Sequence, residues 1–543
     1  MRPYGPSYQT RSVVMGRHGM VASSHPWATQ CGLDVLRQGG NAIDAAIAVN
    51  AMLGLVEPMS CGIGGDLFAL VWDERTKRIH GLNASGRSPG RASADALRAK
   101  GSTISTYGPD SWTVPGCVRG WQTLLEKFGS RPLDALLRPA IATAREGFPV
   151  TEIIAGYWKS GAPRLRGWPD SAATYLIEGR DAPEAGDLFR NPNLASTYER
   201  LANQGPEEFY SGSIAREIVA FSDRHQGLLS LEDFAAQSAD WVTPVRTSYR
   251  GSDVWQIPPN GQGITVLQML NILESFDLSK LRFGSAEHLH LLIEAKRLAY
   301  ADRAAYVAEA NAMTVPVDGL ISKAYGKTQA SRIQLDRANQ DIPPGMPGGH
   351  SDTVYLSVVD EQRNACSLIQ SIFHGFGSQM VPGKLGFALQ NRGSGFSLQA
   401  SHPNCLAPRK RPFHTIIPGM VTRDDKPWFC FGVMGGDMQP QGQVQVLVNL
   451  LDFAMNIQAA GDAPRIQHTG SASPNGEEAQ GLGTVIVERG IDDQAVDGLR
   501  ARGHQVSRGP GNFGGYQGIL IDWERGTLHG ASESRKDGCA LGY

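Results

Sequence analysis

Residues 352–360 read Asp-Thr-Val-Tyr-Leu-Ser-Val-Val-Asp, and they follow a stretch of quite different character. The preceding residues 343–350, Pro-Pro-Gly-Met-Pro-Gly-Gly-His, are typical of a linker because proline and glycine interrupt regular structure. The β-branched and aromatic residues after Thr353 predict a strand, and a short polar turn leads to a second predicted strand over 365–373. A threonine therefore stands at the head of a predicted strand, directly after a linker-like break.

Thr353 is for this reason a candidate nucleophile. A threonine hydroxyl attacks carbonyl groups efficiently only with a base beside it. If the chain is cut between Asp352 and Thr353, the new α-amine can serve as that base, because its unperturbed pKa is about 7.7–8.0. This arrangement is the N-terminal-amine variant of the paired nucleophile and base. The residues alone leave open the alternative that Thr353 simply begins a β-hairpin.

A glycine pair, Gly435-Gly436, lies between a predicted strand over 428–434 and a predicted helix that follows it. Glycines at such a junction let backbone N–H groups point at one spot near the positive end of a helix. An oxyanion hole is often built in this way. The alternative for this pair is a plain tight turn.

The rest of the chain alternates helical and strand patterns. Residues 21–58 are predicted to form two helices, the first opening at Pro26 and stopped by Gly39-Gly40. Asn41 is a good N-cap for the second, which is small and apolar on all sides and therefore buried. Further predictions are strands over 67–72 and 415–422, a loop over 258–263, helices over 264–273 and 288–306, and a mainly helical region over 120–340.

The composition is that of an ordinary soluble globular protein. The 543 residues are 41% hydrophobic and 19% charged, with a net charge of −2, which disfavours a nucleic-acid or membrane-surface partner. Seven cysteines without a CxxC pair favour buried thiols over a disulfide framework or a zinc site. The first residues lack the apolar segment of a signal peptide, and no transmembrane-length apolar run occurs, so a cytoplasmic location is expected.

No metal or cofactor site is predicted from the sequence. The histidines are scattered, and none forms an HxxxH pair. His288 and His290 lie in a predicted helix, where residues two positions apart do not face each other, so they are not expected to share a metal. The nucleophile-elbow, P-loop and dinucleotide-binding patterns are absent from the sequence as well.

Several segments together resemble the gamma-glutamyltranspeptidase family, in the family's order and over nearly the whole chain. The resemblance implies an α+β fold, the four-layer αββα sandwich of N-terminal nucleophile hydrolases, without a cofactor. It also implies autoprocessing into a large subunit, 1–352, and a small subunit, 353–543, with higher oligomers possible. The matching segments are Met20-Val-Ala-Ser-Ser-His-Pro26, Gly39-Gly-Asn-Ala-Ile-Asp-Ala-Ala46, Gly62-Ile-Gly-Gly-Asp66, Pro258-Pro-Asn-Gly-Gln-Gly263, residues 352–360, Arg411-Pro-Phe-His-Thr-Ile-Ile-Pro418, Met434-Gly-Gly436 and Arg535-Lys-Asp-Gly538.

The resemblance assigns catalytic roles to four residues. Thr353 matches the nucleophile, which attacks an amide carbonyl to give an acyl-enzyme, and Ser371 matches a hydroxyl residue that assists it. Gly435 and Gly436 match the glycines whose N–H groups hold the oxyanion. Water or an amine acceptor then releases the acyl group.

The chain departs from the family where gamma-glutamyl enzymes hold the α-amino group of glutamate. The family uses a side-chain amide and a carboxylate there, whereas the matching residues in this chain are Phe373, Arg392 and Gly395. A substrate ammonium would meet an arginine and an apolar ring, which is strongly unfavourable in a partly buried pocket. His414-Thr415 replaces a serine pair that helps to bind the α-carboxylate.

These departures predict an acyl group that carries a carboxylate but no α-amino group. Arg392, together with Arg87, which lies two residues later than the family's carboxylate-binding arginine, could clamp such an anion with bidentate contacts. Family branches of this type include oxamate amidohydrolases and glutaryl-cephalosporin acylases, and oxamate is the sharper expectation. For each arginine the alternative is a structural ion pair, and His414 is not expected to act as an acid or base.

Two other functions compete with a small-molecule amidohydrolase. One is a glutathione hydrolase or gamma-glutamyltransferase proper, which would recognise its donor by other contacts. The second is an unprocessed ligand-binding pseudoenzyme on the same fold. The presence of Thr353, Ser371 and the glycine pair counts against the pseudoenzyme.

Overall fold

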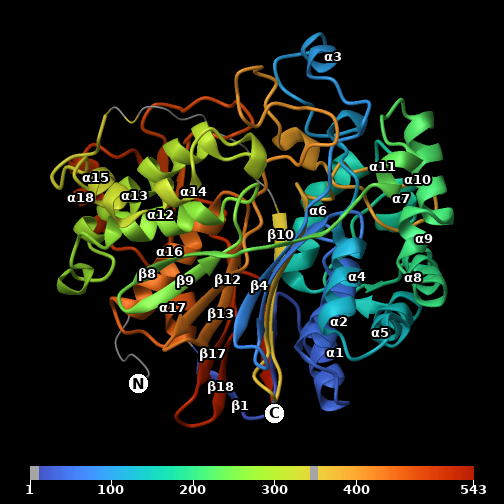
Figure 1. Cartoon of the computed structure of the whole chain (residues 1–543), viewed down its shortest axis with the longest axis horizontal. Helices are drawn as coiled ribbons and strands as arrows, with labels where there is room; N and C mark the ends of the chain where they lie inside the picture. Colours follow the sequence, from blue (N-terminus) through green and yellow to red (C-terminus); the bar gives the residue numbers. More distant parts are fainter. Residues whose placement is uncertain (1–10, 341, 343–351) are drawn as a thin grey trace.

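Two large antiparallel sheets form the centre of the molecule (Figure 1). The computed structural model describes residues 11–340, 342 and 352–543, so the predicted linker over 343–350 lies outside the described residues. In sheet order, the first has β1 (Val14–Gly16), β18 (Thr527–Ala531), β17 (Gly515–Asp522), β13 (Lys426–Met434), β12 (Gly419–Arg423), β9 (Ser252–Gln256) and β8 (Val245–Tyr249). The second has β19 (Cys539–Gly542), β2 (Met20–Ser23), β10 (Asp352–Val359), β11 (Ala365–Phe373), β3 (Asp66–Asp73), β4 (Arg78–Ala84) and β7 (Asp240–Val242).

Helices cover the outer face of each sheet, and each interface has its own hydrophobic core (Figure 1). Tyr355 and Ile369 point into the core between the two sheets, whereas Leu356 and Leu368, one position away, point into the core under the helices. This alternation is the period-2 pattern of strands buried on both faces. The structure therefore confirms the four-layer αββα sandwich that the family resemblance predicted.

The two helical layers come from different parts of the chain. The second sheet is covered by α1 (Pro26–Arg37), α2 (Ala42–Val56), α4 (Cys117–Phe128), α5 (Leu133–Glu146), α6 (Glu152–Leu165), α7 (Pro169–Tyr175), α8 (Pro192–Gln204), α9 (Glu207–Tyr210), α10 (Ser213–Arg224) and α11 (Leu231–Ala235). The first is covered by α12 (Gly263–Leu273), α13 (Ala286–Tyr306), α15 (Lys323–Ala330), α16 (Met438–Leu451), α17 (Ile457–Asp462) and α18 (Asp493–Ala501). Smaller elements are α3 (Ala94–Arg98), α14 (Val317–Leu320), β5 (Phe148–Pro149), β6 (Leu188–Phe189), β14 (Ile466–Thr469), β15 (Thr484–Val487) and β16 (Val506–Arg508).

The predicted helix after Asn41 forms as expected. The Asn41 side chain accepts hydrogen bonds from the first turn of α2, and Asp44 bonds back to the Asn41 N–H, which completes a capping box. Every residue of α2 is buried. Among the described residues, no helix is both long and apolar enough to cross a membrane.

Two predicted boundaries were wrong. Residues 20–23 form strand β2, which pairs with β10 and β19, rather than the start of a helix. The strand predicted over 415–422 begins only at Gly419, because the backbone before it binds elsewhere. The Thr415 carbonyl accepts from the Gln262 side chain, and the Ile417 N–H donates to the Gln439 side chain. These side-chain contacts tie the segment to the site described next.

Candidate active site

Thr353 lies at an irregularity in the pairing of β10 with β11. Asp352 pairs with Phe373 and Val354 with Gln370, so the register shifts at Thr353. Such bulges re-aim a side chain and are frequent beside active sites. The buried Thr353 hydroxyl lies 3.4 Å from the hydroxyl of Ser371, to which it donates, and 3.4 Å from the Gln439 amide nitrogen, from which it accepts. The structure thus brings Thr353 and Ser371 together.

Hydrogen bonds and backbone packing fix the position of Ser371. Its Oγ accepts from the Phe373 backbone N–H at 2.8 Å and from Nη2 of Arg392 at 3.3 Å. Its backbone packs directly on Gly65, where an added Cβ would lie 2.2 Å from the Ser371 carbonyl oxygen. Only glycine tolerates this approach. The Gly62–Asp66 segment therefore supports the strand that carries Ser371.

The glycine pair after β13 has positive backbone φ angles and joins the strand to the start of α16. Gly435 and Gly436 have φ angles of 115° and 57°, which favour glycine. Their carbonyls accept from the N–H groups of Met438 and Gln439 at the start of α16. Across the described part of the chain, no acceptor is bonded to the N–H groups of either glycine. Two unoccupied donors near a helix N-terminus can stabilise a negatively charged oxygen.

Substitution of Gly435 by alanine should lower kcat by roughly 10²–10³-fold, because it would displace an N–H that is expected to hold the oxyanion. A Cβ at this position would lie 2.9 Å from Oδ1 of Asn512, and the φ angle is unfavourable for alanine. Steady-state kinetics of Gly435→Ala beside Gly509→Ala provides the test, since a Cβ at Gly509 meets nothing within 4 Å. Equal losses in both variants would argue against a specific role for Gly435.

Arg392 is a fully buried cation beside this centre. Nη1 donates to the Thr415 hydroxyl at 3.0 Å, Nη2 donates to Ser371, and Nε has no partner. No carboxylate of the described side chains forms an ion pair with it, and the guanidinium instead stacks 3.9 Å from the centre of the Phe373 ring. Burial lowers the pKa of Arg392 to about 9, so the group is still charged at neutral pH. A structural ion pair, the alternative raised from sequence, is not what holds this arginine.

Asp66 and His414 form a fixed network under the site. Asp66 accepts from the backbone N–H groups of Gly86 and Gly116 and from the side chains of Gln390 and His414. Burial, and secondarily Arg392, lowers the pKa of His414 to about 4, so the imidazole is neutral at physiological pH. Its Nδ1 accepts from the Ile416 N–H, which leaves Nε2–H to donate to Asp66. His414 thus donates a hydrogen bond to a buried carboxylate.

Three buried histidines should make the stability depend on pH. Burial lowers the pKa of His25 to about 3, that of His414 to about 4, and that of His468 well below 6.5. Each binds a proton near pH 6.5 in the unfolded chain but not in the folded one. The free energy of unfolding should therefore fall as the pH drops from 6.5 towards 4, by about 1.4 kcal/mol per pH unit for each histidine.

Urea unfolding between pH 7 and 4.5 measures this dependence. The variant His25→Asn keeps a side chain able to cap α1, as His25 does through the Trp27 N–H, but it cannot titrate. The free energy of unfolding of this variant should depend less steeply on pH, by the contribution of one bound proton. A slope that is identical in both proteins would contradict the assignment to His25.

The structure gives Arg87 partners other than the groups around Thr353. Its Nη1 lies 2.7 Å from a carboxylate oxygen of Glu309, and the same nitrogen donates to the Arg409 carbonyl at 3.2 Å. Asp240 approaches its Nη2 at 3.7 Å. These contacts engage the Arg87 guanidinium in a structural ion pair, which was the alternative raised from sequence. The expected clamp of two arginines is therefore not assembled. Of the two arginines expected to form the clamp, Arg392 is the one that contacts Ser371 and Thr415.

The Pro258–Gly263 loop connects the oxyanion glycines with Thr415. The amide nitrogen of Gln262 donates to the carbonyls of Thr415 at 2.8 Å and Gly436 at 3.1 Å. Its amide oxygen accepts from Arg303 at 2.6 Å, and Arg303 also pairs with Asp437 at 2.7 Å. The loop therefore fixes both halves of the candidate site relative to each other.

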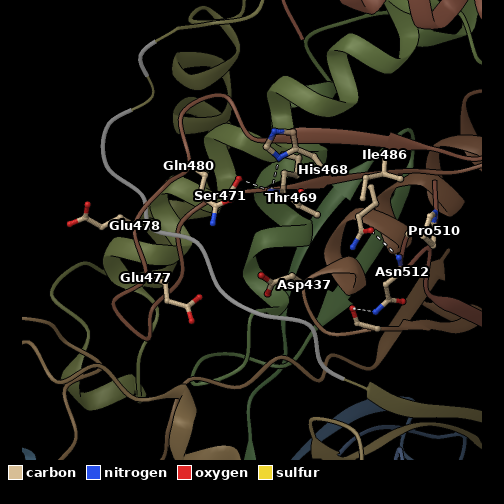
Figure 2. Close-up of a pocket in the computed structure, with 15 residues that line it drawn as sticks. Asp437, His468, Thr469, Ser471, Glu477, Glu478, Gln480, Ile486, Pro510 and Asn512 are labelled. Atoms are coloured by element: carbon tan, nitrogen blue, oxygen red, sulfur yellow. Dashed lines mark hydrogen bonds between the residues drawn. The ribbon is translucent and has the colours of Figure 1, made fainter. Parts of the chain in front are cut away.

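Two cavities meet at this site. A small one, about 90 Å³, is lined by Phe373, Gly395 and Thr415 among others, and it lies against the Arg392 contacts. A larger one, about 620 Å³, begins at Gly435 and is lined by polar side chains; Figure 2 shows Asp437, Glu477 and Asn512 around it. Asp437 and Glu477 line both cavities.

Sequence reasoning missed several residues of the site. Gln439 contacts the Thr353 hydroxyl, and Asp437, Arg303 and Gln262 support the glycine pair. A partial signal existed for Asp437 and Gln439, which follow the glycine pair immediately, and for Gln262, which lies in a quoted motif. No local pattern marks Arg303, since it lies on α13, more than a hundred residues before Asp437 in the chain.

The chain is similar to known proteins over nearly its whole length. The gamma-glutamyltranspeptidase family model matches residues 28–543. The chain is 38% identical to the glutathione hydrolase-like YwrD proenzyme of Bacillus subtilis, over 97% of this chain and 99% of that protein. It is 32% identical to the oxamate amidohydrolase proenzyme of Klebsiella pneumoniae, over 97% and 98% of the two chains.

A crystal structure of a cephalosporin acylase from Bacillus halodurans superposes with a TM-score of 0.90 and 41% identity, covering 100% of this chain and 99% of that one. The family match, the long alignments and the shared fold all extend across both the helical layers and the strands that carry the site. The chain belongs to the gamma-glutamyltranspeptidase family of hydrolases and transferases.

Proposed function

We propose that the chain is a self-processing amidohydrolase that uses Thr353 as an N-terminal nucleophile and takes acyl donors with a carboxylate but no α-amino group. Oxamate is the smallest donor of this class. Cleavage between Asp352 and Thr353 would divide the chain into subunits of residues 1–352 and 353–543. The names of the relatives, which include proenzymes of a glutathione hydrolase-like protein and of an oxamate amidohydrolase, support processing and amide hydrolysis.

The carboxylate preference rests on one observation, the buried Arg392 without a carboxylate partner among the described side chains. The charge of Asp66 acts on Arg392 without a direct ion pair. A buried charge without a directly bonded counter-ion is costly, and an anionic ligand would compensate it. Its donors end on Thr415 and Ser371, and Ser371 contacts Thr353. A small anion bound there would present its neighbouring carbonyl carbon to the Thr353 hydroxyl. An ammonium group at the same place would be repelled.

The geometry supports the following sequence of steps. The α-amine of Thr353 takes the hydroxyl proton, and the oxygen attacks the amide carbon. The N–H groups of Gly435 and Gly436 hold the developing oxyanion, and the protonated amine gives its proton to the leaving nitrogen. Ser371, fixed by the Phe373 N–H and Arg392, keeps the hydroxyl of Thr353 in place. Water, or an amine, then attacks the acyl-threonine and frees the nucleophile.

A glutathione hydrolase is the second candidate, favoured by the name of the B. subtilis relative. A substrate panel of oxamate, glutaryl-p-nitroanilide and gamma-glutamyl-p-nitroanilide distinguishes the two. We expect turnover of the first or second, with kcat/KM for the gamma-glutamyl amide lower by at least about 100-fold, because its ammonium would be buried near Arg392. Faster release of glutamate than of glutarate would refute the carboxylate-only preference. The Gly435→Ala variant identifies background hydrolysis.

A further inference from the structure

Three side chains with metal-binding atoms converge outside the site described above. His290 and Glu294 lie one turn apart on α13, so they share a face of that helix, and His504 follows α18. Their ligand atoms all lie within 4.8 Å of one another, and all three residues are buried. Among the described residues this is the only such group of histidine, cysteine and carboxylate side chains.

The hydrogen bonds around His290 fix which nitrogen faces the group. Nε2 of His290 lies 2.7 Å from the Gln334 carbonyl oxygen, so it carries the proton, and the lone pair of Nδ1 points at Nε2 of His504 at 2.8 Å. A metal-bound histidine characteristically donates its other N–H to a carbonyl or carboxylate in this way. His288 points elsewhere and accepts from the Gly284 N–H, so the His288–His290 pair does not converge, as expected from sequence.

Two hydrogen bonds fix the orientation of the Glu294 carboxylate. One carboxylate oxygen accepts from Arg297 at 2.7 Å and the other from the Asn339 backbone N–H at 3.1 Å. Each oxygen keeps a further lone pair. Arg297 forms an ion pair with Glu294 when no metal is bound. The nearby Arg502 is paired with Glu287. The three side chains are therefore held in place without an ion, with Nδ1 of His290 accepting the proton that Nε2 of His504 carries in this state.

We propose that His290, Glu294 and His504 form a binding site for one divalent transition metal ion of the zinc class. Two imidazoles and one carboxylate suit zinc, cobalt, nickel or copper rather than the hard cations magnesium and calcium. Metal–nitrogen bonds of about 2.0–2.1 Å at a tetrahedral angle place the two nitrogens roughly 3.3 Å apart. The pair must open by only about 0.5 Å, and His504 must move its proton to Nδ1.

The ion would join the two halves of the chain. His290 and Glu294 lie before position 353 and His504 after it, so a bound metal bridges the two subunits of the processed form proposed above. The backbone groups of Gln334 and Asn339 orient His290 and Glu294. Both residues lie close to residue 340, at the end of the described range that precedes position 353. Metal binding itself does not require cleavage, and it needs no part of the Thr353 site.

Titration of the full-length protein with Co²⁺, followed by its visible absorption, and with Zn²⁺ by competition, tests the site. One ion should bind per chain, and His504→Gln should weaken binding by more than about 100-fold, because it removes a direct ligand. The matched control His529→Gln should bind as the unmodified protein does, since within the described part of the chain the His529 side chain hydrogen-bonds only Thr527. Zn²⁺ should also raise the Tm of the unmodified protein and not that of His504→Gln.

The outcome is independent of the proposed function, since the uncleaved variant Thr353→Ala should bind the metal with unchanged stoichiometry. Equal Co²⁺ affinity of His504→Gln and His529→Gln, or less than one-tenth of an ion per chain in the unmodified protein, would overturn the proposal. If His504→Gln does not fold, Glu294→Gln gives the second test. The absorption spectrum of the unmodified protein must in any case report nitrogen and oxygen ligands.

Discussion

Replacing Thr353 by alanine is expected to leave the chain intact and to abolish amide hydrolysis. The variant loses the hydroxyl that is proposed both to start the cleavage of the Asp352–Thr353 bond and to attack the substrate. Loss of a nucleophile of this kind lowers kcat by at least about 10⁴-fold. The fold should be preserved, because only a hydroxyl and a methyl group are removed from one buried residue of β10.

Denaturing electrophoresis with N-terminal sequencing gives the measurement. The unmodified protein should yield two fragments, of which the smaller begins Thr-Val-Tyr-Leu. Thr353→Ser retains a hydroxyl and serves as the matched control, since it should still cleave. One intact band for the unmodified protein after prolonged incubation would contradict the mechanism and favour the ligand-binding alternative.

Local sequence patterns were sufficient where a contact lies close in the chain. The capping box of Asn41 and Asp44 spans four residues, and the strand after Thr353 is specified by its own β-branched and aromatic side chains. The glycine pair could also be predicted, because the strand before it and the helix after it are both evident. These elements needed no knowledge of the tertiary structure.

Contacts between distant segments could not be predicted in this way. Asp66 meets His414 across more than three hundred residues, and Arg87 meets Glu309 across more than two hundred. Both arginines of the expected clamp looked equivalent in sequence. Only packing shows that Arg87 already has a carboxylate partner whereas Arg392 does not. The convergence of His290 with His504 could not be predicted for the same reason, since the two residues lie more than two hundred positions apart.

Arg392→Gln is expected to reduce kcat/KM for a carboxylate-bearing donor by roughly 10²–10³-fold. Removing one partner of a buried, hydrogen-bonded charge pair costs about 2–5 kcal/mol, and here the second partner is the bound substrate. Arg392→Lys should lose less, because it retains a charge but not the fork of two donors that reaches Thr415 and Ser371. Kinetics with oxamate and with glutaryl-p-nitroanilide measures both variants.

A stability measurement separates substrate binding from a structural role for Arg392. Arg465 is equally buried but pairs with Glu533 at 2.8 Å, and Glu533 also pairs with Arg535 at 3.0 Å. Arg465→Gln therefore removes one member of a buried ion-pair network and should destabilise the fold. Arg392→Gln removes a charge that lacks such a partner, and the Tm should therefore stay the same or rise. If Arg392→Gln lowers the Tm as much as Arg465→Gln while kcat/KM is unchanged, the guanidinium is structural and the carboxylate preference has no basis.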